Sequence, residues 1–281
     1  MRTRMLTSVF ALLAVASPAA AQSEWLASEG TSIALEYRHP SIDFGEGVDE
    51  SALTGAYFLS GRFTLPIIGF TGVAEIPFAN ATLKAEDAEE ESEGNGLGNI
   101  YIGAEMPIML GAATIVGGVR LPTMSEDDED DFSDPSPLIG FAGSLTDRFD
   151  AFVQDAIVPQ AGIRLGVPGI PVFDVEANLN ANYMILGGDN DEDNDFVLDG
   201  GVRGFANLLG LRAGVGVEGF WIATTDEEDD GDSMFTQAGL WADYGFGMFR
   251  PSVSFFIPLS NDYKDMVDWT LGLGLEVNLP M

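Results

Sequence analysis

Residues 269–279 read WTLGLGLEVNL, and apolar residues occupy every second position of this stretch. One face of the stretch carries the apolar residues Trp269, Leu271, Leu273, Leu275, Val277 and Leu279. The opposite face carries the polar or small residues Thr270, Gly272, Gly274, Glu276 and Asn278. Successive side chains of a β-strand point to opposite faces, so this period of two predicts a strand with one apolar and one polar side.

The same alternation recurs at residues 173–183 (FDVEANLNANY) and 211–221 (LRAGVGVEGFW). Tilted strands of about 9–11 residues are long enough to cross a lipid bilayer. The stretches also end on aromatic residues such as Tyr183, Trp221 and Trp269, which are typical of the interfacial girdles of membrane barrels. A soluble β-sandwich, with its apolar faces turned inward, is the alternative fold.

Short turns marked by Pro or Gly are expected near Ile67, Met109, Asp147, Gly169, Leu209 and Gly247. Most successive turns lie roughly 40 residues apart, enough for two strands and one long loop. We therefore expect an all-β, transmembrane, antiparallel up-and-down barrel of about 14 strands, with short periplasmic turns and both termini on the periplasmic side. The alternation blurs in residues 137–158, and if this segment is one bent strand or a loop, the count falls to 12. The expected strands are 31–38, 52–64, 69–78, 98–107, 111–122, 137–146, 149–157, 159–167, 171–184, 196–208, 210–223, 234–246, 248–258 and 267–279.

The first 21 residues have the three parts of a secretory signal peptide. Arg2 and Arg4 precede an apolar run from Met5 to Val15, and small residues up to Ala21 supply a cleavage site. We expect residues 22–281 to form a single barrel domain. They contain no second long apolar run and no cysteine, so transmembrane helices, disulfides and thiolate metal sites are not expected.

The chain has a formal net charge of −33 although 46% of its residues are hydrophobic. The acidic residues are concentrated in residues 86–93, 126–134, 189–195 and 226–232, which together hold 24 of the 45. Such runs repel themselves and favour solvated loops, here assigned to the extracellular side. The excess of negative charge also argues against a nucleic-acid partner.

These features together make the chain similar to Gram-negative outer-membrane β-barrel proteins, and to monomeric porin-like channels in particular. The resemblance rests on architecture and covers nearly the whole chain. It implies location in the outer membrane, with lipids, small solutes and the export and barrel-assembly machinery as partners. Many such proteins end in an aromatic residue, and this chain departs from that pattern by ending Leu279-Pro280-Met281.

Arginines and carboxylates share the polar strand faces, which would surround the lumen. The residues expected to line a pore are Arg62, Glu105, Arg120, Arg164, Glu176, Asp199, Arg203, Arg212, Glu218 and Arg250. Two interpretations remain open. The charges form a transverse field that acts on passing solutes, or they pair between neighbouring strands and stiffen the wall.

The acidic loops have three interpretations: adaptation to high salt, capture of divalent cations, or plain solvation. Residues 189–193 (DNDED) resemble the start of a calcium loop, but Asn194 and Gly200 stand where glycine and glutamate are required. No cofactor or defined metal site is therefore expected. Catalysis is not expected either, because His39 is the sole histidine and mobile loops hold carboxylates poorly in place.

The leading functional hypothesis is a passive outer-membrane channel for small solutes. The alternative is a closed structural or surface-interaction barrel whose acidic loops meet cations or partners. A transporter of hydrophobic compounds would need an apolar inner patch, for which Phe58, Phe220 and Phe256 are the candidates.

Overall fold

A computed structural model describes residues 30–42, 48–51, 53–65, 69–85, 92–109, 112–124, 135–144, 147–168, 173–187, 194–223 and 234–279. Strands dominate this part of the chain. They are β1 (Thr31–Ile42), β2 (Val48–Glu50), β3 (Gly55–Leu65), β4 (Phe70–Ala85), β5 (Ser92–Leu97), β6 (Ile100–Ile108), β7 (Ala113–Leu121), β8 (Ala156–Pro168), β9 (Phe173–Leu186), β10 (Asp195–Leu208), β11 (Leu211–Ile222), β12 (Met234–Tyr244), β13 (Phe249–Pro258) and β14 (Val267–Leu279). The helices are α2 (Ser136–Ser144), the short 3-10 helix η2 (Phe149–Phe152) and α3 (Asn261–Met266).

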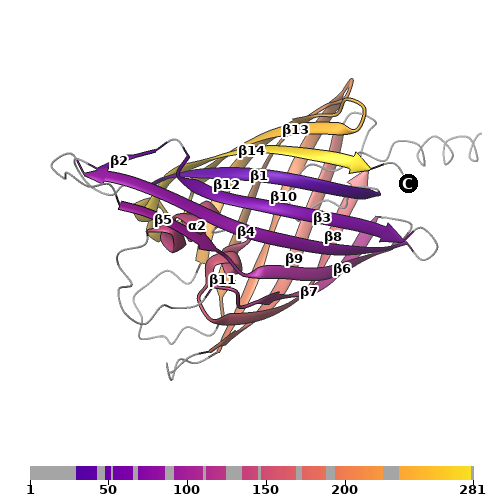
Figure 1. The fold of residues 1–281 in the computed structure, drawn as a ribbon. Coiled ribbons are helices and arrows are strands. Elements are labelled where there is room, and N and C mark those ends of the chain that lie inside the picture. Colours follow the sequence, from indigo (N-terminus) through magenta and orange to yellow (C-terminus); the bar gives the residue numbers. More distant parts are fainter. Residues whose placement is uncertain are drawn as a thin grey trace, which may run out of the picture.

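The strands form a closed antiparallel barrel (Figure 1). Strand β14 returns to β1, with Thr31 opposite Leu279 at one end and Ser41 opposite Trp269 at the other. The wall consists of 12 strands, namely β1, β3, β4 and β6 to β14. Strand β5 continues the path of β6 along β4, and the short β2 pairs with the far end of β4 outside the closed ring. The expected alternative of 12 strands is thus confirmed.

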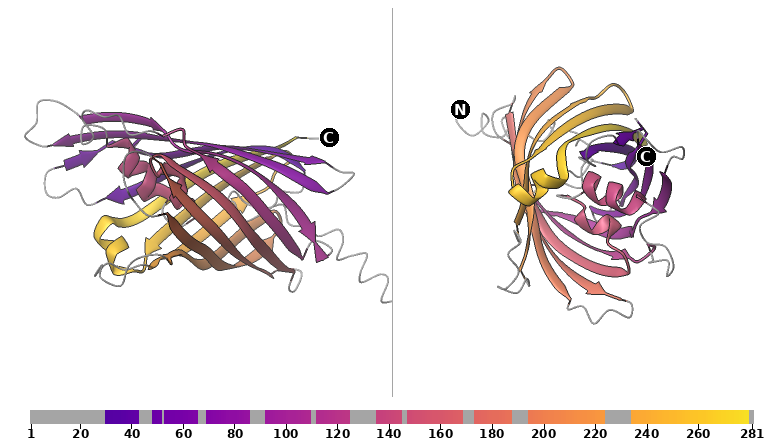
Figure 2. Two further views of the ribbon diagram at one scale, coloured as in Figure 1. Left: turned by 90° about the horizontal axis from the view of Figure 1, so that it is seen from below. Right: turned by 90° about the vertical axis from the view of Figure 1, so that its left-hand side faces the viewer.

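The preferred count of about 14 strands is wrong, because residues 137–158 do not supply two wall strands. The expected strands at 137–146 and 149–157, with a turn at Asp147, are replaced by α2, η2 and the start of β8. Figure 2 shows α2 inside the ring of strands, viewed from the end opposite the short turns. The sequence from Pro137 to Ser144 has no alternating polar face, so it is unsuited to a wall that meets two different environments.

Small residues allow this segment to approach the inner wall. A Cβ atom added at Gly143 would lie 3.1 Å from the Cβ of Ala56, and one at Gly140 would overlap the ring of Phe152. Ile139 and Ala142 are fully buried. Residues 136–155, of which 145 and 146 lie outside the described residues, are called the insert below.

The short turns lie at one end of the barrel, where β14 also ends (Figure 1). One of them is Leu209–Gly210, where both residues have positive φ, at 50° and 87°. This is the backbone of a two-residue hairpin turn that matches the twist of the flanking strands. The connections with the acidic runs join strand ends at the opposite rim, and they lie largely outside the described residues. The expected signal peptide also lies outside them.

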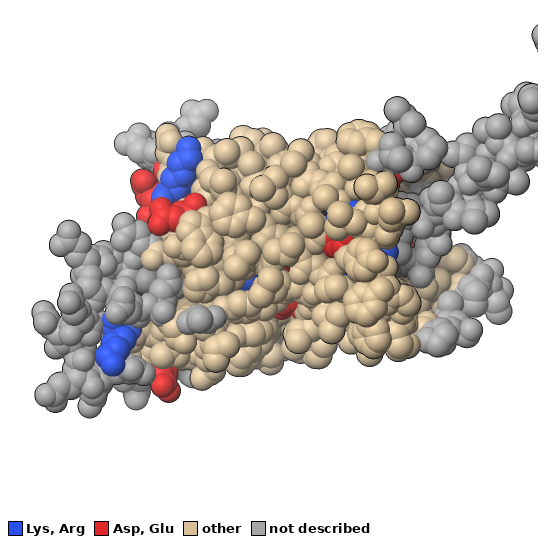
Figure 3. Space-filling model, turned by 90° about the horizontal axis from the view of Figure 1, so that it is seen from above, with Lys and Arg blue, Asp and Glu red and all other residues tan. Residues whose placement is uncertain are grey.

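The outer and inner faces of the wall differ in polarity. Outward residues such as Leu35, Phe63, Leu179 and Val215 have 52%, 58%, 56% and 60% of their surface exposed. The face of the barrel in Figure 3 is accordingly a broad, largely uncharged surface. Among the described residues, no helix is long and apolar enough to cross a membrane.

Candidate functional site in the barrel lumen

A ring of alternating charge surrounds the lumen in the half near the short turns. We call it the charged belt. Its members, in order around the wall, are Arg62, Glu105, Arg164, Glu176, Arg212, Asp243, Arg250 and Glu276, from β3, β6, β8, β9, β11, β12, β13 and β14. Alternation along each strand turns these side chains inward, and barrel closure brings the first and last members together.

Ion pairs connect the belt on one side of the barrel. The carboxylate of Glu105 accepts hydrogen bonds from both Arg62 and Arg164. The Nη1 atom of Arg164 lies 2.6 Å from Glu105 Oε1. Two guanidinium groups therefore share one carboxylate. Both arginines keep a little contact with solvent, since 11% and 13% of their side chains are exposed. This arc carries a surplus of positive charge.

The other arc has more carboxylates. Arg212 donates to Glu176 and lies directly opposite Asp243 in the β11–β12 pairing. Arg250 Nη1 is 3.5 Å from Asp243 Oδ1, and Arg250 lies opposite Glu276 in the β13–β14 pairing. Glu276 also interacts electrostatically with Arg62, which completes the ring. Asp174, hydrogen-bonded by Asn207, adds a further negative charge to this arc.

A second level of polar contacts lies along β9 to β12. Arg203 pairs with Glu218 across the β10–β11 pairing, and its guanidinium stacks 4.1 Å from the ring of Trp241. Gln237 donates to the other oxygen of Glu218 at 2.6 Å and accepts from the hydroxyl of Tyr263 in α3 at 3.2 Å. On the neighbouring wall, Asp199 accepts hydrogen bonds from Asn180 at 2.7 Å and Asn182 at 2.5 Å.

The insert occupies part of the lumen toward the opposite rim and is held there by a network of buried ion pairs. Arg38 in β1 makes a bidentate pair with Asp147, with both hydrogen bonds at 2.6 Å. Arg148 bridges Glu36 at 2.9 Å and Glu75 at 3.0 Å. These contacts join the insert to β1 and β4.

Arg120 in β7 adds a third connection. It donates to Glu75 at 2.9 Å and to Asp150 of the insert at 2.8 Å. Arg120 and Asp147 have no exposed side-chain surface. The insert therefore shields these paired charges from solvent.

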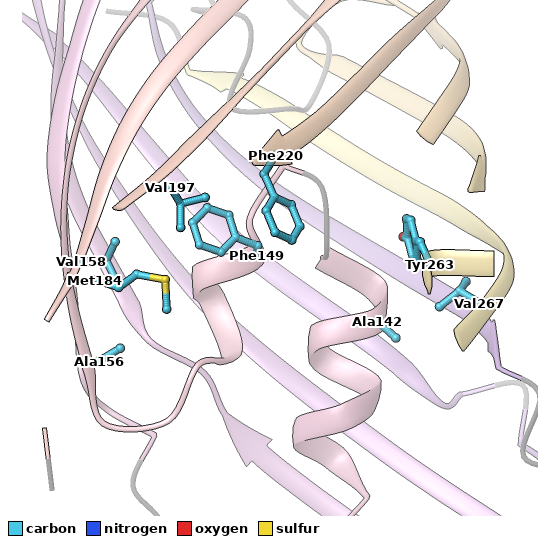
Figure 4. Packing of buried hydrophobic residues seen from close by; sticks show 9 residues of the cluster. All are labelled: Ala142, Phe149, Ala156, Val158, Met184, Val197, Phe220, Tyr263 and Val267. Carbon is cyan, nitrogen blue, oxygen red and sulfur yellow. The ribbon is translucent and has the colours of Figure 1, made fainter. Parts of the chain in front are cut away.

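Apolar side chains pack the insert against the other wall. The ring of Phe149 stacks on Phe220 in β11 with centroids 5.0 Å apart, and Phe220 stacks on Phe235 at 4.8 Å. Val158, Met184 and Val197 belong to the same cluster (Figure 4). Of the three aromatic residues expected in an apolar inner patch, Phe220 packs here, Phe58 packs on Phe152, and Phe256 packs edge-on against Trp241. All three are buried in contacts within the protein.

The charges around the insert set the protonation of its acids. Burial acts to raise the pKa of Asp147, but Arg38 and Arg148 outweigh it and hold this pKa at about 2. Burial raises the pKa of Asp150, and Arg120 offsets this only in part. Burial also raises the pKa of Tyr263 above its ordinary value, so its phenol stays protonated.

All ten residues expected to line a pore project from the inner face of the wall. Six belong to the charged belt, Arg120 contacts the insert, and Asp199, Arg203 and Glu218 lie at the second level. Most are paired with residues on other strands or on the insert. Their role as a pore lining stays a prediction.

The ion-pairing residues of the insert, Asp147, Arg148 and Asp150, were not predicted from the sequence. The available signal was the run DRFD at 147–150, where charges interrupt an apolar segment that does not alternate. Asp243 and Glu276 were likewise not among the residues expected to line a pore, although the same period of two turns them inward.

The expected cation loop at 189–193 lies outside the described residues. Within the described part of the chain, no group of three His, Asp or Glu side chains is arranged to hold a metal ion. His39 lies on β1, with its Nδ1 2.7 Å from the carbonyl of Thr54 and its ring 5.7 Å from that of Trp269. It belongs to an aromatic group rather than to a cluster of acids.

Comparison with solved structures identifies the fold. An outer membrane channel from Pseudomonas putida F1 matches with a TM-score of 0.62 and 11% identity, over 92% of this chain and 99% of that one. The present chain has the fold of outer-membrane β-barrels.

Two further structures agree with this fold. The porin NanC matches with a TM-score of 0.51 and 10% identity, over 87% of this chain and 100% of that one. The translocator domain of the autotransporter NalP from Neisseria meningitidis matches with a TM-score of 0.52 and 12% identity, over 98% of this chain and 96% of that one. No family model and no curated protein matches the sequence.

Proposed function

We propose that the protein spans the bacterial outer membrane and is a channel for small polar solutes. The observation that carries this proposal is the closed wall, which turns an apolar face outward and a charged face inward. A closed barrel satisfies every backbone hydrogen bond between strands, as a hydrocarbon environment requires. The fold shared with outer-membrane channels supports the same conclusion.

Aromatic residues on the strand ends support the membrane location. Toward the rim opposite the short turns, Tyr37 packs on Tyr57 with centroids 4.8 Å apart, and Trp269 packs on Phe255 at 6.0 Å. Near the short turns, Phe246 contacts both Tyr244 and Phe249. Two such groups at opposite ends of the wall are typical of the girdles that sit at membrane interfaces.

This function assigns an orientation and partners. The short turns and the end of β14 would lie in the periplasm, and the rim with the acidic runs would face the exterior. Residues 1–21 would direct export, and residues 22–281 would insert as one barrel with the assembly machinery. Lipids would cover the outer wall, and the insert would narrow the lumen so that only small solutes pass.

Planar-bilayer recording of the purified protein tests the proposal. We expect discrete conductance steps of small amplitude, because a barrel of this size is partly filled by side chains and further narrowed by the insert. Protein denatured before addition is the control. Conductance no greater than that control would contradict the channel and favour the closed structural barrel.

A further inference from the structure

The charged belt contains buried polar atoms that no described residue satisfies. Both carboxylate oxygens of Asp243 lack a hydrogen-bond partner among the described residues, and so do Oε2 of Glu176 and Oε2 of Glu276. Asp243 has only 1% of its side chain exposed, so bulk solvent does not meet this need. Buried polar groups in folded proteins are normally hydrogen-bonded, so such a concentration calls for an explanation.

Several hydrogen-bond donors of the charged belt also lack a partner among the described residues. Within the described structure, Nε and Nη1 of Arg212, Nε and Nη1 of Arg250, and Nε of Arg62 have no acceptor. Unused donors and unused acceptors therefore occur side by side on the same ring. A simple anion would satisfy only the arginines, and a simple cation only the carboxylates.

A small pocket on the inner wall lies beside the charged belt, although no belt residue lines it. Its lining includes Arg203, Trp241, Ser252 and Ser254. Ser252 is directly opposite Asp243 in the β12–β13 pairing, so the pocket begins one strand away from the residue with two unused oxygens. The hydroxyl groups of the serines add uncharged hydrogen-bonding capacity at the same place.

We propose that the charged belt binds small zwitterionic solutes of the α-amino-acid class. The ammonium group would donate to Asp243 and Glu276, and the carboxylate would accept from Arg250 and Arg212. The eight belt residues carry equal numbers of positive and negative charges, so a solute with no net charge and two charged ends matches them without leaving either sign uncompensated. This inference rests on the proposed channel function and names its preferred solute class.

Swelling of proteoliposomes that contain the full-length protein tests the inference. The probes are L-alanine and lactamide, which are isomers of equal size and differ in that only alanine is a zwitterion. After subtraction of the rate for protein-free liposomes, we expect L-alanine to enter about three to ten times faster, the order expected from the net contribution of one hydrogen bond. Equal rates for the two isomers would overturn the inference and leave the channel intact. No protein-dependent entry of either solute would overturn the channel itself.

Variants of the charged belt test which residues cause the preference for alanine over lactamide. We expect the double variant Asp243→Asn/Glu276→Gln to lower the alanine-to-lactamide ratio to about one, because the acceptors for ammonium lose their charge. The matched control Glu93→Gln removes an exposed carboxylate on β5, outside the belt, and should keep the wild-type ratio. A ratio unchanged in the folded double variant would contradict the site. If that variant does not fold, the wild-type comparison of the two isomers still decides the inference.

Discussion

Arg120 shows how a single side chain ties the insert to the wall. It has no exposed side-chain surface, and its neighbours are two carboxylates and the carbonyl of Asn99. A buried ion pair adds modest stability compared with a well-packed apolar replacement, but removal of one partner leaves the other charge buried and uncompensated.

Replacement of Arg120 should therefore be costly. We expect Arg120→Met to lower the free energy of unfolding by about 3–5 kcal/mol, because Glu75 and Asp150 lose their shared counterion. Chemical unfolding in detergent, followed by tryptophan fluorescence, measures the change. Lys84→Met, at an exposed position on β4, is the control and should change stability by no more than about 0.5 kcal/mol. A loss below about 1 kcal/mol for Arg120→Met would show that the pairing is not needed for folding.

Leu209 carries local backbone strain that the fold does not require. Its φ is 50°, and 91% of its surface is exposed. The left-handed conformation costs a branched residue roughly 1–2 kcal/mol, whereas Asn before Gly is favoured in this turn. We expect Leu209→Asn to raise the unfolding free energy by about 1 kcal/mol. The control Leu208→Asn makes the same change at the neighbouring strand residue and should not raise the unfolding free energy. Equal changes in unfolding free energy for both variants would contradict the role of the positive φ at residue 209.

At the scale of elements, alternation predicted the wall strands because each strand separates two environments. It failed where a segment meets only one environment. Residues 136–144 lie inside the lumen, and a helix with small residues packs there without needing a polar face. The length of β4 was also underestimated, since it runs to Ala85 rather than to residue 78 by pairing with β2 and β5 beyond the closed ring. Such pairing depends on partners distant in sequence.

The insert should limit conductance. We expect replacement of residues 136–155 by a short Gly–Ser linker to raise single-channel conductance severalfold, because the linker removes the Phe149 packing and the Arg38–Asp147 pair from the lumen. Bilayer recording of folded protein measures this. An unchanged conductance would show that the insert does not form the constriction.

The ion pair between Asp147 and Arg38 should keep the insert in place until the pH is very low. The pKa of Asp147 is about 2 in the folded protein, below the ordinary value of 3.8. Its stabilising contribution is therefore complete above pH 4 and is lost as the pH falls through about 2.

We expect pepsin to cleave the insert faster at pH 2 than at pH 3.5. The cleavage rate is divided at each pH by the rate for a denatured reference protein, which corrects for the change in pepsin activity. For the Asp147→Asn variant, this corrected cleavage rate should exceed that of the wild-type protein already at pH 3.5. A wild-type insert that stays equally resistant at both values would contradict the role assigned to Asp147.

At the scale of the whole molecule, the sequence predicted that arginines and carboxylates lie inside and apolar residues outside. It did not predict the order of charges around the belt. That order depends on strand tilt and register, which bring Arg62 of β3 close enough to Glu276 of β14 for their charges to interact. The charges of the insert were likewise not expected in the lumen, since their segment was assigned to the wall.

The central claim is that solutes cross through the lumen, past the charged belt. The chain has no cysteine, so a single thiol can be placed where it reports on this path. Ser252 lies in the lumenal pocket opposite Asp243, whereas Leu275 on the neighbouring strand lies on the outer wall with 43% of its surface exposed.

The decisive measurement is the bilayer current through Ser252→Cys before and after a charged, membrane-impermeant thiol reagent is added. We predict a clear loss of current for Ser252→Cys and none for Leu275→Cys. A current that is unaffected by modification at Ser252, with labelling confirmed by mass, would contradict a conducting lumen.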